Sequence, residues 1–223
     1  MNNPEIRDAW LDYASQYPHQ WAYFKYAGQF VNQTTRVEGK ASGNKPNLYN
    51  LFTEQCYNLL RPDGHCGIVI PSGIYTDFST MQLRQMLFEK TTVTGLFGFE
   101  NRKMIFEGVD SRFKFVVLTF EKTGHTDKFP AAFMRHDVAE LEGFPNGNSV
   151  TVSVELVREL SPDSLSIPEF KSDKDIAIAE KMLPFPLLAD AETGWGLELY
   201  GEELNMTRSS GYFKNYETDY PVY

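Results

Sequence analysis

The most regular hydrophobic pattern lies in the middle of the chain. Residues 67–70 (Gly-Ile-Val-Ile) form a continuous apolar run, which is typical of a strand covered on both faces in a parallel sheet. A Pro-Ser-Gly turn at 71–73 ends this strand, and apolar residues at helical spacing follow over 78–88. The apolar runs 92–99 and 113–120 predict two more strands. This order of strand, helix, strand, loop and strand predicts an α/β fold.

The flanking segments extend the pattern. Residues 47–60 place leucines and a phenylalanine on one face of a helix, which a Pro-then-Gly turn stops. We expect residues 129–134 to form a hairpin with 113–120, so that the sheet is mixed and has an antiparallel edge. Apolar and polar residues alternate over 150–156, which predicts a further strand.

The two ends of the chain have weaker patterns. Residues 4–30 place aromatic side chains at helical spacing on both sides of Pro18 and predict two short helices. These aromatic residues are expected to pack in a core or subdomain, with a base-stacking face as the alternative. Further on, we expect an irregular linker over 161–170, a short helix over 173–183 and a strand over 195–200.

Composition limits the class of protein. The chain has 223 residues, of which 42% are hydrophobic, and this suits one sizeable globular domain with or without an appendage. No apolar run approaches the ~18 residues of a membrane-spanning helix, and the polar start of the chain predicts no secretory signal. A net charge of −9 argues against general nucleic-acid binding by this chain alone, because phosphate contacts need clustered cations.

The chain contains two cysteines, Cys56 and Cys66, which fit a reducing cytoplasm better than a disulfide framework. His65 lies next to the second cysteine, but the spacing lacks the paired ligands of a zinc site, so we predict no metal. The histidines have no partner at catalytic spacing, and no nucleophile elbow is present. Hydrolase chemistry therefore has little support.

Several motifs in a fixed order resemble the second half of the catalytic domain of N6-adenine DNA methyltransferases, especially the large restriction–modification and phage-defence methylases. Residues 47–77 resemble the motif V helix and the motif VI strand with its terminal Pro-Ser. Residues 93–106 resemble motif VII, and residues 113–124 resemble motif VIII. The resemblance covers about 45–125 well. More loosely, residues 150–200 resemble the connector that precedes a target-recognition domain in this family.

This resemblance implies methyl transfer from S-adenosylmethionine to the exocyclic amine of a flipped adenine, without a metal and without a catalytic residue in this chain. The family holds the amine with an Asn-Pro-Pro-aromatic motif and binds the cofactor with a glycine-rich loop after its first strand. Asn3-Pro4-Glu5 lacks the second proline and the aromatic residue, and no glycine-rich loop follows a first apolar strand. We therefore expect an inactive fragment that binds the cofactor weakly or not at all. A truncation, a split enzyme and a degenerate module are the three explanations.

The resemblance also implies two cofactor-binding residues. Phe52 matches the motif V position that walls the adenine ring of the cofactor in relatives, whereas a place in the helix core beside Leu48 and Leu51 is the alternative. Pro71 closes a strand near the cofactor edge in the family pattern, although a simple strand-terminating turn also explains it.

Four residues of the loop after the strand 92–99 are candidates for substrate binding. Phe106 matches the aromatic residue that stacks against the flipped adenine in relatives. Asn101, Arg102 and Lys103 lie where ligands bind in open α/β sheets, at the carboxyl end of the strand, and are candidate DNA contacts. A solvated charged turn is the alternative for these three.

We thus expect an α/β fold with a partial Rossmann-like methyltransferase sheet. The predicted parts are a helical segment (1–40), the carboxyl half of a methyltransferase-like domain (41–145) and a connector (146–223). The predicted partners are DNA, the remainder of the methyltransferase domain and a target-recognition domain, in the cytoplasm and without a membrane. The alternative function is a non-catalytic DNA- or protein-binding module built on a degenerate half-fold.

Overall fold

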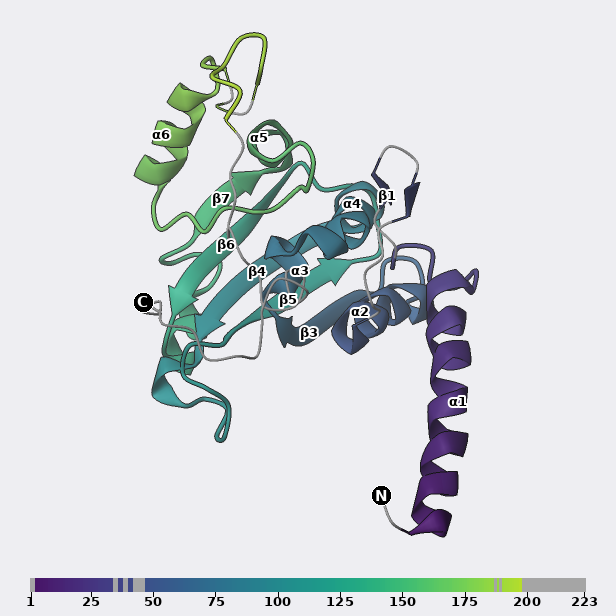
Figure 1. Cartoon of the computed structure of the whole chain (residues 1–223). Coiled ribbons are helices and arrows are strands. Elements are labelled where there is room, and N and C mark those ends of the chain that lie inside the picture. The colour runs from purple at the N-terminus through teal and green to yellow at the C-terminus, as the bar shows by residue number, and fades with distance from the viewer. Residues whose placement is uncertain are drawn as a thin grey trace, which may run out of the picture. The chain divides into compact units, whose positions relative to one another are not determined.

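The computed structural model describes residues 3–33, 36–37, 40–41, 47–186, 188 and 190–197. The chain forms two compact units, Met1–Leu183 and Pro184–Tyr223. All helices and strands of the described residues lie in the first unit (Figure 1). In that part of the chain, no helix is long and apolar enough to cross a membrane.

The first unit contains a five-stranded mixed sheet and a separate two-stranded one. Its helices are α1 (Pro4–Tyr26), α2 (Leu48–Leu59), α3 (Gly73–Thr76), α4 (Met81–Lys90), α5 (Val154–Leu160) and α6 (Asp173–Met182). Its short 3-10 helices are η1 (Phe78–Thr80), η2 (Asn101–Lys103) and η3 (Val138–Gly143). Its strands are β1 (Arg36–Val37), β2 (Lys40–Ala41), β3 (His65–Pro71), β4 (Thr92–Glu100), β5 (Lys114–Glu121), β6 (Lys128–Arg135) and β7 (Val150–Ser153).

The large sheet has the strand order β3-β5-β4-β6-β7. β5 is antiparallel to both β3 and β4, so these two strands run parallel to each other, with α3, η1 and α4 between them in sequence. β6 pairs parallel with β4, and β7 pairs antiparallel with β6. This arrangement confirms the predicted α/β fold with a mixed sheet.

The predicted hairpin between 113–120 and 129–134 is wrong, because β6 leaves β5 and pairs with β4. The Thr126 side chain explains this path. Its hydroxyl accepts a hydrogen bond from Val93 N at 2.9 Å and donates one to Thr91 O at 2.6 Å. These two bonds hold the segment before β6 at the beginning of β4, on the side opposite β5.

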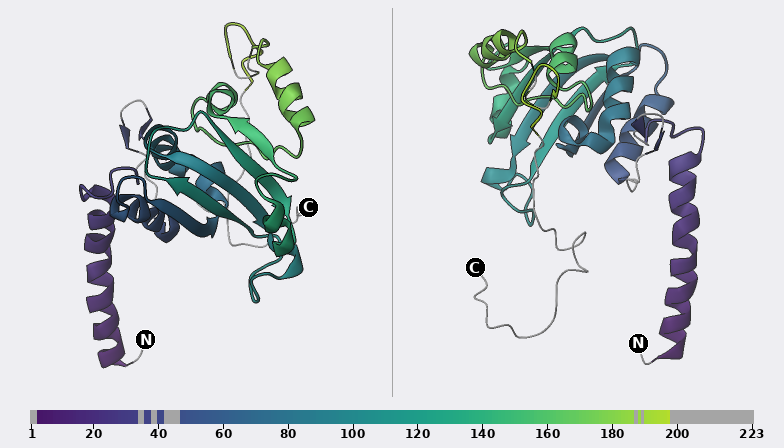
Figure 2. Two further views of the ribbon diagram at one scale, coloured as in Figure 1. Left: turned by 180° about the vertical axis from the view of Figure 1, so that it is seen from behind. Right: turned by 45° about the horizontal axis from the view of Figure 1, so that its top comes forward.

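The two faces of the sheet are covered to different extents. The helices α3 and α4 lie over one face of the sheet (Figure 1). The main core lies between this face and side chains from α3, α4, α5 and the segment after α5. The view from behind in Figure 2 shows the strands in front of α2 and α4. On this second face, a smaller cluster consists of Phe97, Phe99 and Ala132, packed against Phe115 and Phe144 among others.

β3 differs from the strand that its sequence predicts. Its apolar run indicated burial on both faces, but of its residues only Ile70 is buried, and Val69 is 53% exposed. Among the described strands, β3 pairs only with β5, so it forms one edge of the sheet. The prediction fails because Val69 points to the second face, which the described part of the chain leaves largely uncovered at this edge.

The predicted pair of amino-terminal helices is a single helix, α1, which continues through Pro18. Asn3 caps it by accepting a hydrogen bond from Glu5 N at 2.9 Å, and Pro4 suits the first helical position. All residues of α1 are described and none is buried. Trp21 and Phe24 are half-buried, and the Phe24 ring meets the ring of the buried Phe30 edge-on at 5.6 Å. The expected packing of aromatic residues is therefore confined to the carboxyl end of this segment.

The strand predicted over 150–156 ends at Ser153, because the Ser153 hydroxyl accepts a hydrogen bond from Leu156 N and begins α5. The predicted helix over 173–183 is confirmed as α6, with a capping box between Ser172 and Asp175. Residues 195–197 of the expected carboxyl-terminal strand have no strand conformation, and residues 198–200 lie outside the described residues.

The first compact unit extends beyond the boundary predicted after residue 145. Val152, Val157, Leu165 and Ile167 are all buried in the main core. Residues of the expected connector therefore belong to the same hydrophobic core as the sheet, up to Leu183.

Candidate functional site

The loop between β4 and β5 is held closed by Asn101. The Asn101 side chain donates to Phe106 O and Val109 O, both at 2.9 Å, and accepts from Phe106 N at 2.9 Å. The residue is fully buried, so its amide groups are used inside the loop. Asn101 therefore positions Phe106 and does not present its own side chain to a ligand in this structure, which differs from the predicted DNA contact.

Phe106 is 44% exposed at the outer side of this loop. Its ring meets the Phe115 ring edge-on at 4.8 Å, and Phe115 stacks on Phe99 at 5.1 Å. This chain of rings fixes Phe106 from behind and leaves part of the ring free for a further stacking contact.

Phe106 forms one wall of an apolar slot of about 290 Å³ beside the end of β3. The slot is lined by Val69, Ile70, Pro71, Phe106, Val109, Phe113, Lys114 and Phe115. Apart from Lys114, these side chains are apolar. The slot is thus suited to a flat, mostly apolar group.

A polar hollow of about 710 Å³ adjoins the slot and shares Pro71, Phe113 and Lys114 with it. The rest of its lining comes from the start of α2, the turn after β3 and the end of the loop: Asn47, Tyr49, Ser72, Gly73, Asp77, Asp110 and Arg112. An apolar and a polar compartment therefore meet at the carboxyl end of β3, where open α/β sheets bind ligands.

The side chains of Tyr49 and Asp77 lie close to Gly73 in the turn after β3. A Cβ at position 73 would come so close to the Tyr49 hydroxyl and the Asp77 carboxylate that these side chains would have to move. The Tyr49 hydroxyl donates to Asp77 Oδ2 at 3.4 Å. Burial, and then the Asp77 charge, raises the pKa of Tyr49 to about 12, so this hydroxyl stays protonated at neutral pH.

Lys114 joins the two compartments, but its charge is already neutralised. Its Nζ lies 2.6 Å from Glu169 Oε2 and 3.8 Å from Glu100 Oε1. The Tyr75 hydroxyl donates to Glu169 Oε1 at 2.8 Å, and burial raises the pKa of Tyr75. Glu169, from the segment after α5, thus holds Lys114 in place at the site.

Arg102 and Lys103 are exposed on the same loop and paired with acids. Arg102 Nε lies 3.1 Å from Glu100 Oε2, and Lys103 Nζ lies 2.6 Å from Asp137 Oδ2. The hydrogen bond to Asp137 raises the pKa of Lys103. These contacts are those of a solvated charged turn, and a phosphate would have to compete with the two carboxylates.

Phe52 lies on the outer side of α2 and is 60% exposed, whereas Leu51 beside it is buried. It is therefore not a core residue of the described structure. Phe52 lines neither compartment, while Pro71 lines both. Their cofactor contacts remain predictions.

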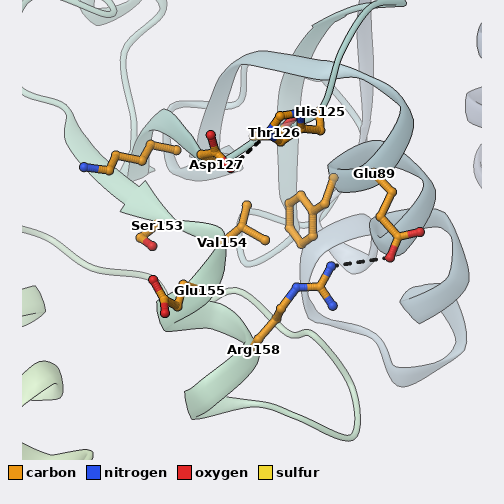
Figure 3. Close-up of a pocket in the computed structure, with 10 residues that line it drawn as sticks. Glu89, His125, Thr126, Asp127, Ser153, Val154, Glu155 and Arg158 are labelled. Atoms are coloured by element: carbon orange, nitrogen blue, oxygen red, sulfur yellow. Dashed lines mark ion pairs between the residues drawn. The ribbon is translucent and has the colours of Figure 1, made fainter.

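A second hollow, of about 620 Å³, lies near the other end of β4 (Figure 3). It contains two ion pairs, His125–Asp127 at 3.2 Å and Arg158–Glu89 at 3.5 Å. Nothing in the sequence indicated this hollow, since its lining joins α4, the start of β6 and α5. In the part of the chain that the structure describes, no three acidic, histidine or cysteine side chains form a possible metal site.

No sequence motif indicated that Lys114, Tyr49 and Glu169 belong to the candidate site. Lys114 and Glu169 are 55 positions apart and meet only because the segment after α5 packs across α3. Ile167 N donates to Tyr75 O at 2.9 Å, and Ser166 Oγ donates to Thr76 O at 2.9 Å. No local pattern indicates such a contact.

The first unit is therefore a mixed α/β domain with an aromatic loop and a two-part site at the carboxyl ends of parallel strands. Residues 24–106 match the model of the Eco57I restriction-modification methylase family. This match covers the helix α2, the strands β3 and β4, and the loop as far as Phe106. It confirms the predicted methylase resemblance for this part of the chain.

Several solved structures are partly similar to this chain. A type I restriction-modification methyltransferase subunit from Streptococcus thermophilus is 16% identical, with a TM-score of 0.49, over 68% of this chain and 34% of its own. The EcoKI M protein is 14% identical, with a TM-score of 0.48, over 68% and 46%. A putative type I modification subunit from Vibrio vulnificus YJ016 is 13% identical, with a TM-score of 0.46, over 60% and 34%. The chain thus spans less than half of each of these proteins. No curated protein matches it.

Proposed function

We propose that this chain provides the base-binding wall of a cytoplasmic DNA adenine-N6 methyltransferase of restriction–modification or phage defence. The observation that carries the proposal is the apolar slot beside Phe106, at the end of the segment that matches the methylase family. In such an enzyme, the target adenine leaves the duplex before its amine can react.

The slot suits a flipped adenine for physical reasons. A base that stacks on an aromatic side chain gains roughly 1–3 kcal/mol. The Phe106 ring is braced by Phe115 and its loop by Asn101, so little conformational freedom would be lost on binding. Arg102 and Lys103 lie on the same loop and would reach the DNA backbone if phosphates replaced their acidic partners.

S-adenosylmethionine would supply the methyl group. The polar hollow fits part of this cofactor, because Asp77 offers carboxylate oxygens to hydroxyl donors beside Pro71. We propose that Pro71 contacts the cofactor and that the exposed ring of Phe52 walls its adenine. The described residues thus fit one side of a cofactor, while the sequence lacks the glycine-rich loop and the Asn-Pro-Pro-aromatic motif.

We therefore propose that a further polypeptide segment completes the site and that the chain alone is inactive. The outer edge of β3 suits such a segment. Ser72 N donates to Lys114 O, and Lys122 N donates to Gly64 O, so the even-numbered residues of β3 bond to β5. The N–H groups of Gly67 and Val69 then point outward, and a strand parallel to β3 would end beside Pro71. A target-recognition domain and DNA are the other proposed partners.

The experiment is titration calorimetry of S-adenosylmethionine into this chain and into the chain joined to the half of a methylase that carries the two missing motifs. We expect weak or no binding to the chain alone and clear binding to the joined protein. Tight binding to the chain alone would show that its cofactor site is complete. It would contradict the proposal that a further polypeptide segment completes the site.

The absence of both motifs also supports a second candidate, a non-catalytic DNA- or protein-binding module. A methyl-transfer assay with radiolabelled cofactor separates the two. The enzyme proposal expects labelled adenine from the joined protein. DNA binding without any label, in a joined protein that binds the cofactor, would favour the module.

A further inference from the structure

Arg84, in α4, is a buried cation with no part in the chemistry described above. Its side chain is only 1% exposed. Burial lowers the pKa of Arg84 to about 10, so the guanidinium keeps its charge at neutral pH. In the described part of the chain, it donates hydrogen bonds to three backbone carbonyls and to the Thr80 hydroxyl, and to no carboxylate. A buried charge is costly unless it is well hydrogen-bonded, so these four partners hold the guanidinium in one position.

The guanidinium joins two segments that are far apart in the sequence. Arg84 Nη2 donates to Asp77 O at 2.6 Å and also to Ser164 O at 2.7 Å. Arg84 Nη1 donates to Ile74 O at 2.8 Å. Ile74 and Asp77 belong to the connection between β3 and α4 (residues 72–80), and Ser164 belongs to the segment after α5 (residues 161–170). One side chain thus ties the β3–α4 connection to the segment after α5.

The β3–α4 connection presents Asp77 to the polar hollow. The Asp77 carboxylate lines this hollow and lies 3.4 Å from the Tyr49 hydroxyl. The backbone carbonyl of the same residue is bonded to the buried guanidinium of Arg84. The position of the carboxylate in the hollow therefore depends on a hydrogen bond that Asp77 makes on its core side.

Two further hydrogen bonds attach the segment after α5 to the same connection. Ser166 Oγ donates to Thr76 O, and Ile167 N donates to Tyr75 O, both at 2.9 Å. Tyr75 and Thr76 directly precede Asp77 in the chain. A displacement of the segment after α5 would therefore also displace Asp77.

We propose that Arg84 is a positioning residue for the cofactor, which fixes Asp77 at the polar hollow and makes its position depend on the segment after α5. This inference rests on the proposed function, in which Asp77 accepts hydrogen bonds from the cofactor. Arg84 lines neither compartment of the site and acts only through the β3–α4 connection. A carboxylate that is already held in place binds its ligand more tightly, because less conformational freedom is lost on binding.

The first test uses amide exchange in the chain alone, measured by nuclear magnetic resonance. The N–H groups of Asp77 and Ile167 donate to backbone carbonyls of the β3–α4 connection. In Arg84→Met, exchange at these two amides should become about tenfold faster relative to the amides of β5, because hydrogen bonds to a charged group are lost. Val152→Ala, which removes core volume but no hydrogen bond, is the matched control and should leave this ratio unchanged. An unchanged ratio in Arg84→Met would overturn the positioning role.

A second measurement needs no variant to fold. In the wild-type joined protein, saturating S-adenosylmethionine should slow exchange at Asp77 and also at Ile167, because coupling between two positions is reciprocal. Slower exchange at Asp77 with no change at Ile167 would contradict the dependence on the segment after α5.

Calorimetry of the joined protein tests the link to the cofactor. Arg84→Met and Asp77→Asn should each weaken S-adenosylmethionine binding about tenfold. The double variant should bind no more weakly than Asp77→Asn, since Arg84 acts through Asp77. Additive losses, or a loss in Arg84→Met that is no larger than in Val152→Ala, would show that Arg84 only stabilises the fold.

These outcomes separate the role of Arg84 from the proposed function. If the joined protein does not bind the cofactor at all, the proposed function fails and this role of Arg84 fails with it. If the joined protein binds the cofactor and Arg84→Met binds it equally well, only the role of Arg84 is overturned.

Discussion

At the scale of single residues, Phe106 and Asn101 have separate tasks in one loop. Phe106 offers a partly exposed ring, and Asn101 is fully buried and closes the loop with three hydrogen bonds. The resemblance implied a stacking role for Phe106, and the position at the carboxyl end of a strand made Asn101 a candidate DNA contact. An asparagine side chain suits a DNA contact and a loop closure equally well, and only its burial decides between them.

Phe106→Ala in the joined protein should weaken methylation of its DNA substrate about 5- to 150-fold, because a stacking contact of roughly 1–3 kcal/mol is lost. Duplex binding should stay nearly unchanged, as measured by fluorescence anisotropy. Tyr13→Ala, on the exposed face of α1, is the control. A methylation rate equal to that of the control would exclude the stacking role.

Glu100 provides a pH-dependent contribution to stability. Hydrogen bonds from His136 and then Arg102 lower its pKa in the folded chain. A lowered pKa stabilises the fold above the unfolded value of about 4.3, and this stabilisation is lost as the pH falls through the folded pKa. Glu100→Gln should therefore lower the free energy of unfolding at pH 6 and have less effect at pH 3.

Urea denaturation at the two pH values measures this difference, and Glu107→Gln on the exposed part of the same loop is the control. If Glu100→Gln costs the same at both pH values, the ionised carboxylate is not the source of the stability.

At the scale of elements, local patterns identified most helices and strands but not their neighbours. α2, α6 and the strands β3, β4 and β5 lie close to their predicted ranges. The partner of β6 was predicted wrongly because Thr126 directs the chain past β4. Hydrogen bonds between a side chain and a backbone segment far away in the sequence leave no periodic signal.

α1 shows that a proline does not always divide a helix. Pro18→Ala restores an N–H donor for Ala14 O and removes the ring clash, which typically costs about 3 kcal/mol within a helix. Amide exchange around this turn of α1 should slow, as measured by nuclear magnetic resonance. The melting temperature of the sheet should not change, since no residue of α1 is buried.

Gln16→Ala leaves all backbone donors in place and is the matched control for Pro18→Ala. Equal exchange rates in the two variants would show that the proline does not weaken α1.

At the scale of the whole molecule, the segment after residue 145 is part of the core of the first unit. The side chains that it buries include Val152, Val154, Leu156, Val157 and Leu165. Burial of a large aliphatic side chain contributes about 1.5–3 kcal/mol, whereas a whole domain is stable by only about 5–15 kcal/mol. The sheet therefore needs this segment to remain folded.

A chain shortened to residues 1–145 should lose cooperative thermal unfolding, whereas residues 1–183 should retain it, as followed by circular dichroism and calorimetry. The second chain is the control for truncation, because it keeps the complete first unit. A cooperative transition in residues 1–145 would contradict the shared core.

The local pattern of residues was enough to predict the α/β class, the succession of strands and helices around the site and the loop that carries Phe106. These properties depend on residues that are close in sequence, such as the apolar run of β3 and the turn at Gly73. The tertiary structure decided the strand neighbours, the burial of Asn101, the ion pair between Lys114 and Glu169 and the exposed edge of β3. Each of these depends on contacts between residues far apart in the chain, and the free energy of such contacts appears only when the whole domain is packed.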